Sequence, residues 1–317
     1  MEYAKPNDTT TEPDDFIEDM EWLLFLWLVL LSGFLLALSQ QHRKILRSKD
    51  FQYGLFDKPD RKEEQNRLRL SCATRTGLVR SENQDAIQDL RFDAKTAGVV
   101  LCDGAGGVEG GKQAAQSAVA VISGYLHQQW QQKRALNIVD LEAAIKAART
   151  KSEQSTLNGV TTALLAVVQD NTLIYASLGD GAISLLWPDG MINHLQALHH
   201  TAGQPSNIIN AYIGDGCTVP PRVGWQRLEP KSTVMLMSDG AADLFPFEDY
   251  ALKRDQHSEA WHKAGVGYAD KLLQQLESAR DEHNAYLHSD NMSLGLISYG
   301  ERFYRDRGET SEERFDA

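Results

Sequence analysis

The chain has 317 residues, 42% of them hydrophobic and 24% charged, a balance that is ordinary for a folded protein of one large domain or two small ones. The net charge of -12 argues against nucleic acid as the main partner, because phosphate backbones attract basic surfaces. Three widely spaced cysteines, Cys72, Cys102 and Cys217, form neither a disulfide framework nor a zinc pattern, which fits a reducing compartment.

The N-terminal part changes character abruptly. Residues 1–21 are polar and acidic, and we expect a tail that buries little apolar surface. Residues 22–38, WLLFLWLVLLSGFLLAL, carry no charge and are near the shortest length that crosses a bilayer core. Basic residues follow in the linker 40–66, which predicts a single transmembrane helix over residues 22–39 in the inner (cytoplasmic) membrane, with the remainder in the cytoplasm. The alternatives are a cleaved signal peptide, which would begin with basic residues, and a buried core helix, which would show a polar face.

Residues 67–300 have the pattern of one compact domain. Apolar and alternating runs, with helical spacing between them, predict elements in this order: strands over 68–74 and 97–102, helices over 112–132 and 139–154, strands over 161–168, 172–178, 182–187, 191–195 and 233–237, a helix over 258–278 and a strand over 292–299. Asp140 is the expected N-cap of the second helix, and Pro188-Asp189-Gly190 the turn of a hairpin. Strands and helices cluster instead of alternating, which predicts an antiparallel α+β fold. Residues 301–317 form a charged C-terminal tail.

Aspartates fall where the predicted strands begin or end. Asp103 follows the apolar residues 99–102, Asp180 and Asp239 also follow apolar runs, and Asp290 lies just before the last strand. Strands that converge at one edge would bring these carboxylates together, where they repel one another unless cations lie between them. Such oxygen ligands suit Mg²⁺ or Mn²⁺, and two ions about 3.5–4 Å apart can activate a water for in-line attack on phosphorus. A single Asp-Gly pair is more typical of a turn, so only the whole set favours a metal hydrolase.

Short motifs, in order along the chain, resemble the metal-dependent (PPM, type 2C) protein phosphatases in their bacterial form. They are residues 80–86 (RSENQDA), Asp103-Gly104-Ala105-Gly106-Gly107, Gly159-Val160-Thr161-Thr162, Gly179-Asp180-Gly181, residues 210–214, Ser238-Asp239-Gly240 and Asp290-Asn291. Each motif alone is weak, but the ordered set is highly specific and covers residues 67–300. The resemblance implies a four-layer α-β-β-α sandwich of two antiparallel sheets, and hydrolysis of phosphoserine or phosphothreonine in proteins.

The resemblance also implies a metal centre with two ions, Mn²⁺ or Mg²⁺. Asp85 and Asp103 would bridge or flank the ions and take part in catalysis, and the carbonyl of Gly104 would be a further ligand. Asp239 and Asp290 would complete the coordination of the second ion.

Two further residues take roles from the same motifs. Arg80 would bind the substrate phosphate, because a guanidinium matches two phosphate oxygens and stays charged. Asp180 matches a position that holds a third, weaker metal in some bacterial members, although Gly-Asp-Gly is equally a turn.

The chain departs from the family pattern at three positions. Ala105 stands where eukaryotic members carry a histidine and bacterial ones usually a methionine, so no side chain there can donate a proton and a metal-bound water would have to protonate the leaving oxygen. Gly181 replaces the usual serine and Val160 the usual threonine. Residues 197–227 would form the variable flap that shapes substrate choice.

The expected partners are phosphorylated proteins, a Ser/Thr kinase with its targets, and the membrane. One alternative is a catalytically weak or silent relative that acts as a signalling or scaffold protein at the membrane. Another is an anchored partner of a kinase or secretion apparatus, in which catalysis is secondary. The intact aspartates speak against a silent protein.

Overall fold

The computed structural model describes residues 68–105, 110–155, 159–195, 210–279 and 290–300. The chain divides into two units, Met1–Pro59 and Asp60–Ala317, and every described residue lies in the second. The predicted acidic tail, transmembrane helix, basic linker and C-terminal tail therefore fall outside the described residues. In the part of the chain that is described, no helix combines the length and the hydropathy needed to cross a bilayer.

The described strands form two antiparallel sheets of five strands each. The first sheet, in spatial order, contains β1 (Leu68–Arg75), β10 (Met292–Tyr299), β9 (Thr233–Met237), β6 (Ala182–Leu186) and β7 (Ile192–His194). The second contains β2 (Asp85–Arg91), β3 (Thr96–Asp103), β4 (Ala163–Gln169), β5 (Thr172–Leu178) and β8 (Arg222–Arg227). Every predicted strand is present, whereas β2 and β8 were not predicted.

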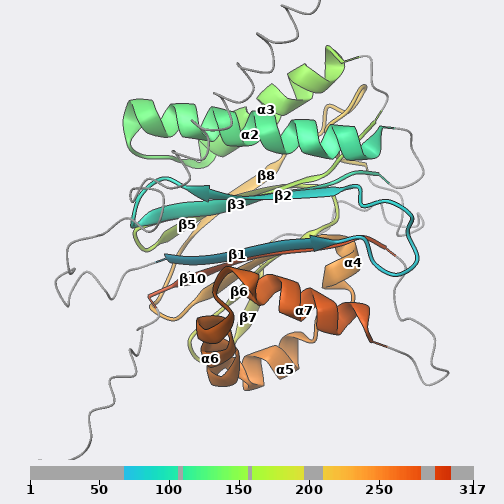
Figure 1. The fold of residues 1–317 in the computed structure, drawn as a ribbon. Coiled ribbons are helices and arrows are strands. Elements are labelled where there is room, and N and C mark those ends of the chain that lie inside the picture. The colour runs from blue at the N-terminus through green and yellow to red at the C-terminus, as the bar shows by residue number, and fades with distance from the viewer. Residues whose placement is uncertain (1–67, 106–109, 156–158, 196–209, 280–289, 301–317) are drawn as a thin grey trace, which may run out of the picture. The chain divides into compact units, whose positions relative to one another are not determined.

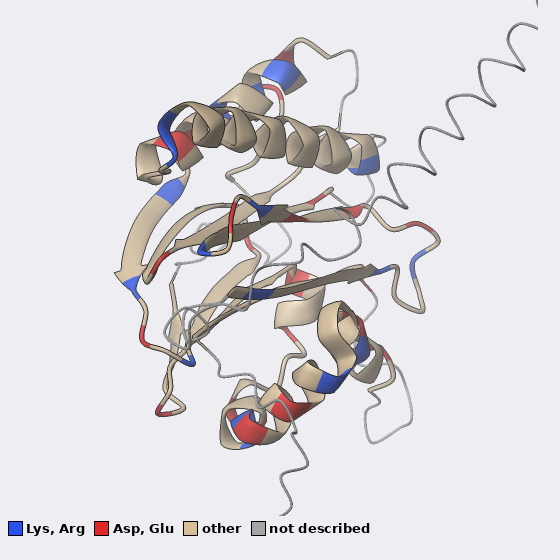
Figure 2. Cartoon of the chain, turned by 60° about the vertical axis from the view of Figure 1, so that its left-hand side comes forward, with Lys and Arg blue, Asp and Glu red and all other residues tan. Residues whose placement is uncertain are grey.

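Helices cover the outer face of each sheet, so the predicted four-layer α-β-β-α arrangement is confirmed (Figure 1). The second sheet carries α2 (Gly111–Lys133) and α3 (Ile138–Glu153). The first sheet carries α4 (Asp239–Ala242), α5 (Phe247–Leu252), α6 (Arg254–Ala264), the short 3-10 helix η2 (Gly265–Gly267) and α7 (Tyr268–Glu277). Acidic and basic residues both occur on α3, α6 and α7, whereas α2 carries only basic residues near its ends (Figure 2).

The core is arranged in three apolar layers, and strand β3 shows why. Successive side chains of a strand point to opposite faces, so Val99 and Leu101 pack between the two sheets while Val100 and Cys102 pack against α2 and α3. A strand covered on both faces reads as a continuous apolar run, which is how this strand was recognised. Each fully buried leucine contributes about 1.5–3 kcal/mol, so these layers hold the strand ends in place.

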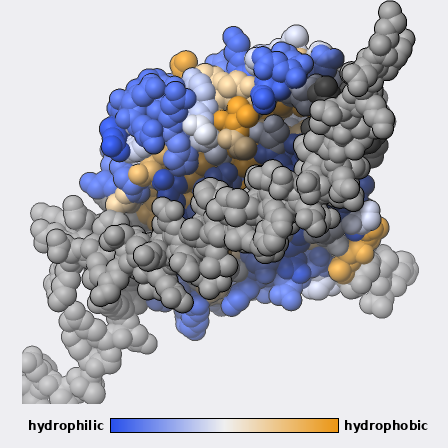
Figure 3. All heavy atoms as spheres, turned by 45° about the horizontal axis from the view of Figure 1, so that its top comes forward, coloured by the Kyte–Doolittle hydropathy of each residue, from blue (hydrophilic) through white to orange (hydrophobic). Residues whose placement is uncertain are grey.

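The face that carries α2 and α3 is largely hydrophilic, with apolar side chains showing among the polar ones (Figure 3). A shallow hollow there is lined by both helices, with Val121, Ala143 and Ala147 beside Lys146 and Lys151. The helices lie against the second sheet and do not reach the strand ends that carry the predicted site residues, apart from the start of α2 at Gly111.

The N-cap of helix α3 lies three residues before the predicted one. Asn137 is the N-cap, and its Oδ1 accepts from the backbone N–H of Val139 at 2.9 Å and of Asp140 at 3.2 Å. The Asp140 carboxylate in turn accepts from the N–H of Asn137 at 3.1 Å, which completes a capping box. The prediction of Asp140 as N-cap was wrong, because two polar residues three apart compete for that position.

The helix predicted over 258–278 is in fact two helices. Helix α6 ends at Ala264 and α7 begins at Tyr268, with the 3-10 turn between them. Gly265 has a φ of +59°, a conformation that favours glycine and ends the first helix. The Gly-Val-Gly sequence lets the chain turn, so that both Trp261 and Tyr268 are buried against the first sheet.

Part of the predicted flap belongs to the second sheet. Of residues 197–227, those at 197–209 lie outside the described ones, and the last six form β8, which pairs antiparallel with β5. Gly224 lies opposite Tyr175, and a Cβ at Gly224 would approach the Tyr175 hydroxyl oxygen to 2.4 Å. The sequence RVGWQR is too polar to indicate a strand, so this edge strand was not predicted. Its side chains are half-buried at most.

Candidate metal centre

Antiparallel pairing places the predicted site residues at one end of the sandwich. In the second sheet β2 begins where β3 ends, and in the first sheet β10 begins where β9 ends. The aspartates occupy these ends: Asp85 opens β2, Asp103 closes β3, Asp180 lies between β5 and β6, Asp239 follows β9 and Asp290 precedes β10. A hydrogen bond from Ser293 of the first sheet to Asp85 of the second joins the two ends at 2.7 Å.

Asp85 is the most deeply buried of these carboxylates, with 6% of its surface exposed. It is paired directly across the sheet with Asp103. Its Oδ2 accepts from the Ser293 hydroxyl, whereas its Oδ1 is buried and has no hydrogen-bond partner among the described residues. A buried carboxylate oxygen without a donor is costly, so this atom is suited to a cation.

The carboxylates influence one another electrostatically. Burial raises the pKa of Asp85 from 3.8 to about 6, partly offset by the hydroxyls of Ser293 and Ser238. Burial, then the charges of Asp85, Asp239 and Asp180, raises the pKa of Asp103 well above its usual range. Burial and the charge of Asp290 raise the pKa of Asp239. Each of the five predicted aspartates thus lies within electrostatic reach of at least one other.

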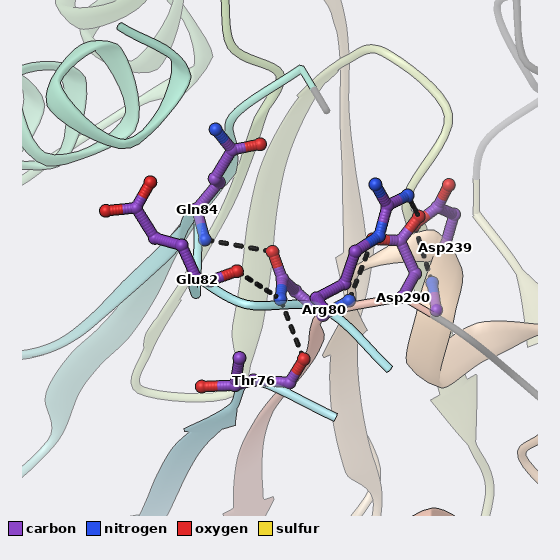
Figure 4. Close-up of polar contacts among 8 residues, drawn as sticks. Thr76, Arg80, Glu82, Gln84, Asp239 and Asp290 are labelled. Carbon is purple, nitrogen blue, oxygen red and sulfur yellow. Dashed lines mark hydrogen bonds and ion pairs between the residues drawn. The ribbon is translucent and has the colours of Figure 1, made fainter. Parts of the chain in front are cut away.

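Arg80 lies beside this cluster, on the loop between β1 and β2 (Figure 4). Its Nη2 donates to Asp290 Oδ2 at 2.7 Å, and Asp290 Oδ1 accepts from the backbone N–H of Asn291 at 2.8 Å. Asp239 Oδ1 accepts from the N–H of Gly240 at 2.6 Å. Both carboxylate oxygens of Asp290 and one of Asp239 therefore accept hydrogen bonds from protein donors.

Within the described ranges, no three His, Cys, Asp or Glu side chains surround a common point closely enough to form a ready cation cage. Asp290 is hydrogen-bonded to Arg80, and Asp85 to Ser293. The chemistry of the set nevertheless fits hard cations, since every predicted ligand is an oxygen and one of them is orphaned. The ligand roles of these residues, including the Gly104 carbonyl, stay predictions.

Several hydroxyl groups lie around Asp85 and Asp103, and the sequence analysis did not predict roles for them. Thr162 Oγ1 accepts from the backbone N–H of Asp103 at 3.0 Å, and Thr161 Oγ1 donates to the backbone carbonyl of Asp103 at 2.8 Å. Ser238 Oγ accepts from the N–H of Ser293 at 2.8 Å. The signal was present, because Thr161, Thr162 and Ser238 belong to recognised motifs, whereas Ser293 is a polar residue inside an apolar strand.

The departures from the family pattern are accommodated by backbone contacts. A Cβ at Gly181 would approach the Met237 carbonyl oxygen to 2.7 Å, so a serine there would require β6 to shift. The N–H of Ala105 donates to the Val160 carbonyl at 3.0 Å, which keeps the end of β3 beside the start of β4. These three positions therefore affect local packing and leave the five aspartates in place.

Comparison with known proteins identifies the class. The family model for protein phosphatase 2C matches residues 78–281. A protein of Streptococcus pyogenes serotype M6, described as protein phosphatase 2C-type, is 27% identical in an alignment 204 residues long that covers 56% of this chain and 80% of that protein. The chain belongs to the protein phosphatase 2C family.

Solved structures share the fold. The serine/threonine phosphatase of S. agalactiae superposes with a TM-score of 0.56 at 22% identity, over 73% of this chain and 98% of that one. The catalytic domain of the phosphatase PstP in complex with two manganese ions superposes with a TM-score of 0.55 at 20% identity, over 74% and 100%. The predicted fold is confirmed, and so is the predicted class, a metal-dependent protein serine/threonine phosphatase.

Proposed function

We propose that this chain hydrolyses phosphoserine and phosphothreonine in proteins at the strand ends described above, with two Mn²⁺ or Mg²⁺ ions. Asp85 and Asp103 would lie between or beside the ions, the Gly104 carbonyl would add a ligand, and Asp239 and Asp290 would hold the second ion. The observation that carries this proposal is the buried Oδ1 of Asp85, which lacks a donor within an all-carboxylate cluster. When bound, such ions supply an activated water for in-line attack on phosphorus.

The chain's own residues would bind and orient the substrate. Arg80, with 41% of its side chain exposed, can reach solvent and present two N–H groups to phosphate oxygens. The Ser293 hydroxyl orients the Asp85 carboxylate, and the Thr162 hydroxyl fixes the backbone of Asp103 at the end of β3. Position 105 carries a methyl group, so the proton for the leaving oxygen has to come from water and not from this side chain.

Asp180 is the candidate for a third, weaker ion. Its charge contributes to the raised pKa of Asp103, so it lies within electrostatic reach of the other carboxylates. An Asp180→Asn variant would lower activity at limiting Mn²⁺ and recover at high Mn²⁺, which activity measured across a manganese titration would reveal. Equal activity at every concentration would remove Asp180 from the site.

A membrane location is a separate proposal that rests on the sequence. Residues 22–39 would anchor the chain with its phosphatase domain in the cytoplasm, near a Ser/Thr kinase whose targets it would dephosphorylate. Membrane fractionation of the full chain and of a variant with Leu30→Lys and Leu31→Lys tests it. Only the unchanged chain should sediment with membranes, and equal sedimentation of both would contradict the anchor.

The enzymatic proposal is tested with a phosphothreonine peptide and the full chain in detergent. Phosphate release should require Mn²⁺ or Mg²⁺ and should fall by orders of magnitude in Asp239→Asn. Asp243→Asn, one helical turn further along and exposed, is the matched control and should keep its activity. No turnover by the unchanged chain with metal bound would favour the alternative of a silent signalling or scaffold protein.

A further inference from the structure

The loop between β1 and β2, residues 76–84, carries Arg80 and crosses from one sheet to the other. Among the described residues, backbone hydrogen bonds outside helices and strands reach this loop only at Gln84, whose carbonyl accepts from the N–H of Gly104 at 3.2 Å. The loop therefore depends on side chains for its conformation.

One buried side chain makes three hydrogen bonds with the backbone of this loop. Asn291 has 5% of its surface exposed, and its Oδ1 accepts from the N–H of Gln84 at 2.9 Å. Its Nδ2 donates to the carbonyls of Thr76 at 2.8 Å and of Glu82 at 2.9 Å (Figure 4). The amide thus holds the loop at its first residue and at two residues near its end, Glu82 and Gln84, on both sides of Arg80.

The same residue also reaches the metal-ligand candidate beside it. The backbone N–H of Asn291 donates to Asp290 Oδ1 at 2.8 Å, and Asp290 Oδ2 accepts from Arg80 at 2.7 Å. The loop passes very close to this point, since a Cβ at Gly77 would lie 2.4 Å from the Asp290 carbonyl oxygen. The side chain of Asn291 therefore contacts the loop that carries Arg80, and its backbone contacts Asp290.

We propose that Asn291 is a positioning residue, which sets the Arg80 guanidinium relative to the Asp290 carboxylate and hence to the phosphate. This inference rests on the phosphate-binding role proposed for Arg80. Asparagine suits the task because one planar amide offers an acceptor for Gln84 and two donors for the carbonyls. Aspartate would lose both donors, and alanine would leave three partly buried backbone groups without this partner.

A merely stabilising residue would give different kinetics from a positioning residue. If Asn291 acts through Arg80, its loss moves the guanidinium and weakens phosphate binding. Asp85, Asp103 and Asp239 keep their contacts, which do not involve Arg80. A displacement of about 1 Å can cost up to about a hundredfold, so we expect a tenfold to hundredfold effect. Loss of fold stability alone would lower the melting temperature and leave the Michaelis constant of the folded fraction unchanged.

The experiment compares Asn291→Ala, Arg80→Ala and the double variant in the full chain, with a phosphothreonine peptide as substrate and inorganic phosphate as inhibitor. Asn291→Ala should raise KM and the phosphate inhibition constant about tenfold or more, and shift the Mn²⁺ concentration for half-maximal activity less than about threefold. In the Arg80→Ala background the same change should add little, because the two residues act through one contact. Ser71→Ala is the matched control: it loses two buried hydrogen bonds, to Val266 and Ala269, on the face of β1 that meets η2 and α7.

Hydrogen–deuterium exchange of residues 76–84 provides a readout that does not depend on activity. Exchange there should accelerate in Asn291→Ala, and not in Ser71→Ala. Unchanged exchange, or KM and phosphate inhibition effects that simply add to those of Arg80→Ala, would overturn the inference. Should Arg80→Ala itself leave phosphate inhibition unaltered, the role of Arg80 fails, and the exchange result still shows whether Asn291 holds the loop.

Discussion

Replacing Asp85 by asparagine should stabilise the metal-free protein and at the same time abolish its response to metal. The pKa of Asp85 rises from 3.8 to about 6 because the carboxylate is buried. At about 1.4 kcal/mol per pKa unit, its ionised form costs the folded state roughly 3 kcal/mol. The amide remains an acceptor for the Ser293 hydroxyl, but it is itself a buried polar group, so we expect a net gain of about 1–2 kcal/mol, or about 3–6 °C.

The pH dependence has a defined sign. The folded-state pKa of Asp85 lies above the unfolded value, so the folded protein binds this proton more tightly. In EDTA, the unchanged chain should therefore gain stability as the pH falls from about 7.5 through 6. The Asn variant should gain less over the same range, because the group that titrates is gone.

The assay is thermal unfolding of the full chain in detergent, in EDTA and in MnCl₂. Manganese should raise the melting temperature of the unchanged chain and leave that of Asp85→Asn almost unmoved. Asp140→Asn is the matched control, because Asp140 is also buried but binds Lys133 at 2.7 Å and accepts from the N–H of the α3 N-cap, Asn137, so its replacement should destabilise. The reasoning is refuted if Asp85→Asn melts below the unchanged chain in EDTA, or if manganese stabilises both equally.

Two further predictions concern other contacts. Arg80→Ala should tighten Mn²⁺ binding, measured by calorimetry, because the substitution removes the hydrogen bond from Arg80 to Asp290 Oδ2. The KM for phosphopeptide should rise at least tenfold, because the guanidinium no longer binds the phosphate. Weaker Mn²⁺ binding would contradict the competition between arginine and metal. Gly98→Ala should destabilise the fold by about 1–3 kcal/mol, since its Cβ would meet the Ala166 carbonyl oxygen at 2.5 Å. Gly124→Ala in α2, with no atom within 4 Å of the new Cβ, should instead stabilise by up to about 1 kcal/mol, and denaturant unfolding of the pair separates steric conflict from backbone entropy.

Strands buried on both faces could be predicted because their sequence is apolar throughout. Strand β5 has the bounds that the pattern indicates, Thr172–Leu178, and β9 those of Thr233–Met237. Strand β2 was missed because its burial is uneven: Leu90 is buried while Asp89 and Arg91 are exposed. Its sequence DAIQDLR has too little contrast to indicate a strand without knowledge of its neighbour β3.

The convergence of the aspartates could be predicted because polar residues that end apolar strands meet at one edge. What could not be predicted is which side chains hold them. Asn291 was recognised as part of a motif. Its hydrogen bonds to the loop of residues 76–84 could not be predicted, because they join residues about 210 positions apart in the chain. Likewise the pairing of Arg80 with Asp290 depends on where the loop crosses between the sheets.

The central claim is that acidic side chains from both sheets hold a pair of cations at their common end. Crystals soaked in manganese, with diffraction recorded at the manganese absorption edge, test it most directly. We predict two anomalous peaks within coordination distance of Asp85, Asp103, Asp239 and Asp290, with the Arg80 guanidinium released from Asp290. Peaks at other positions, or none beside Asp85 in a fully soaked crystal, would contradict the proposed site.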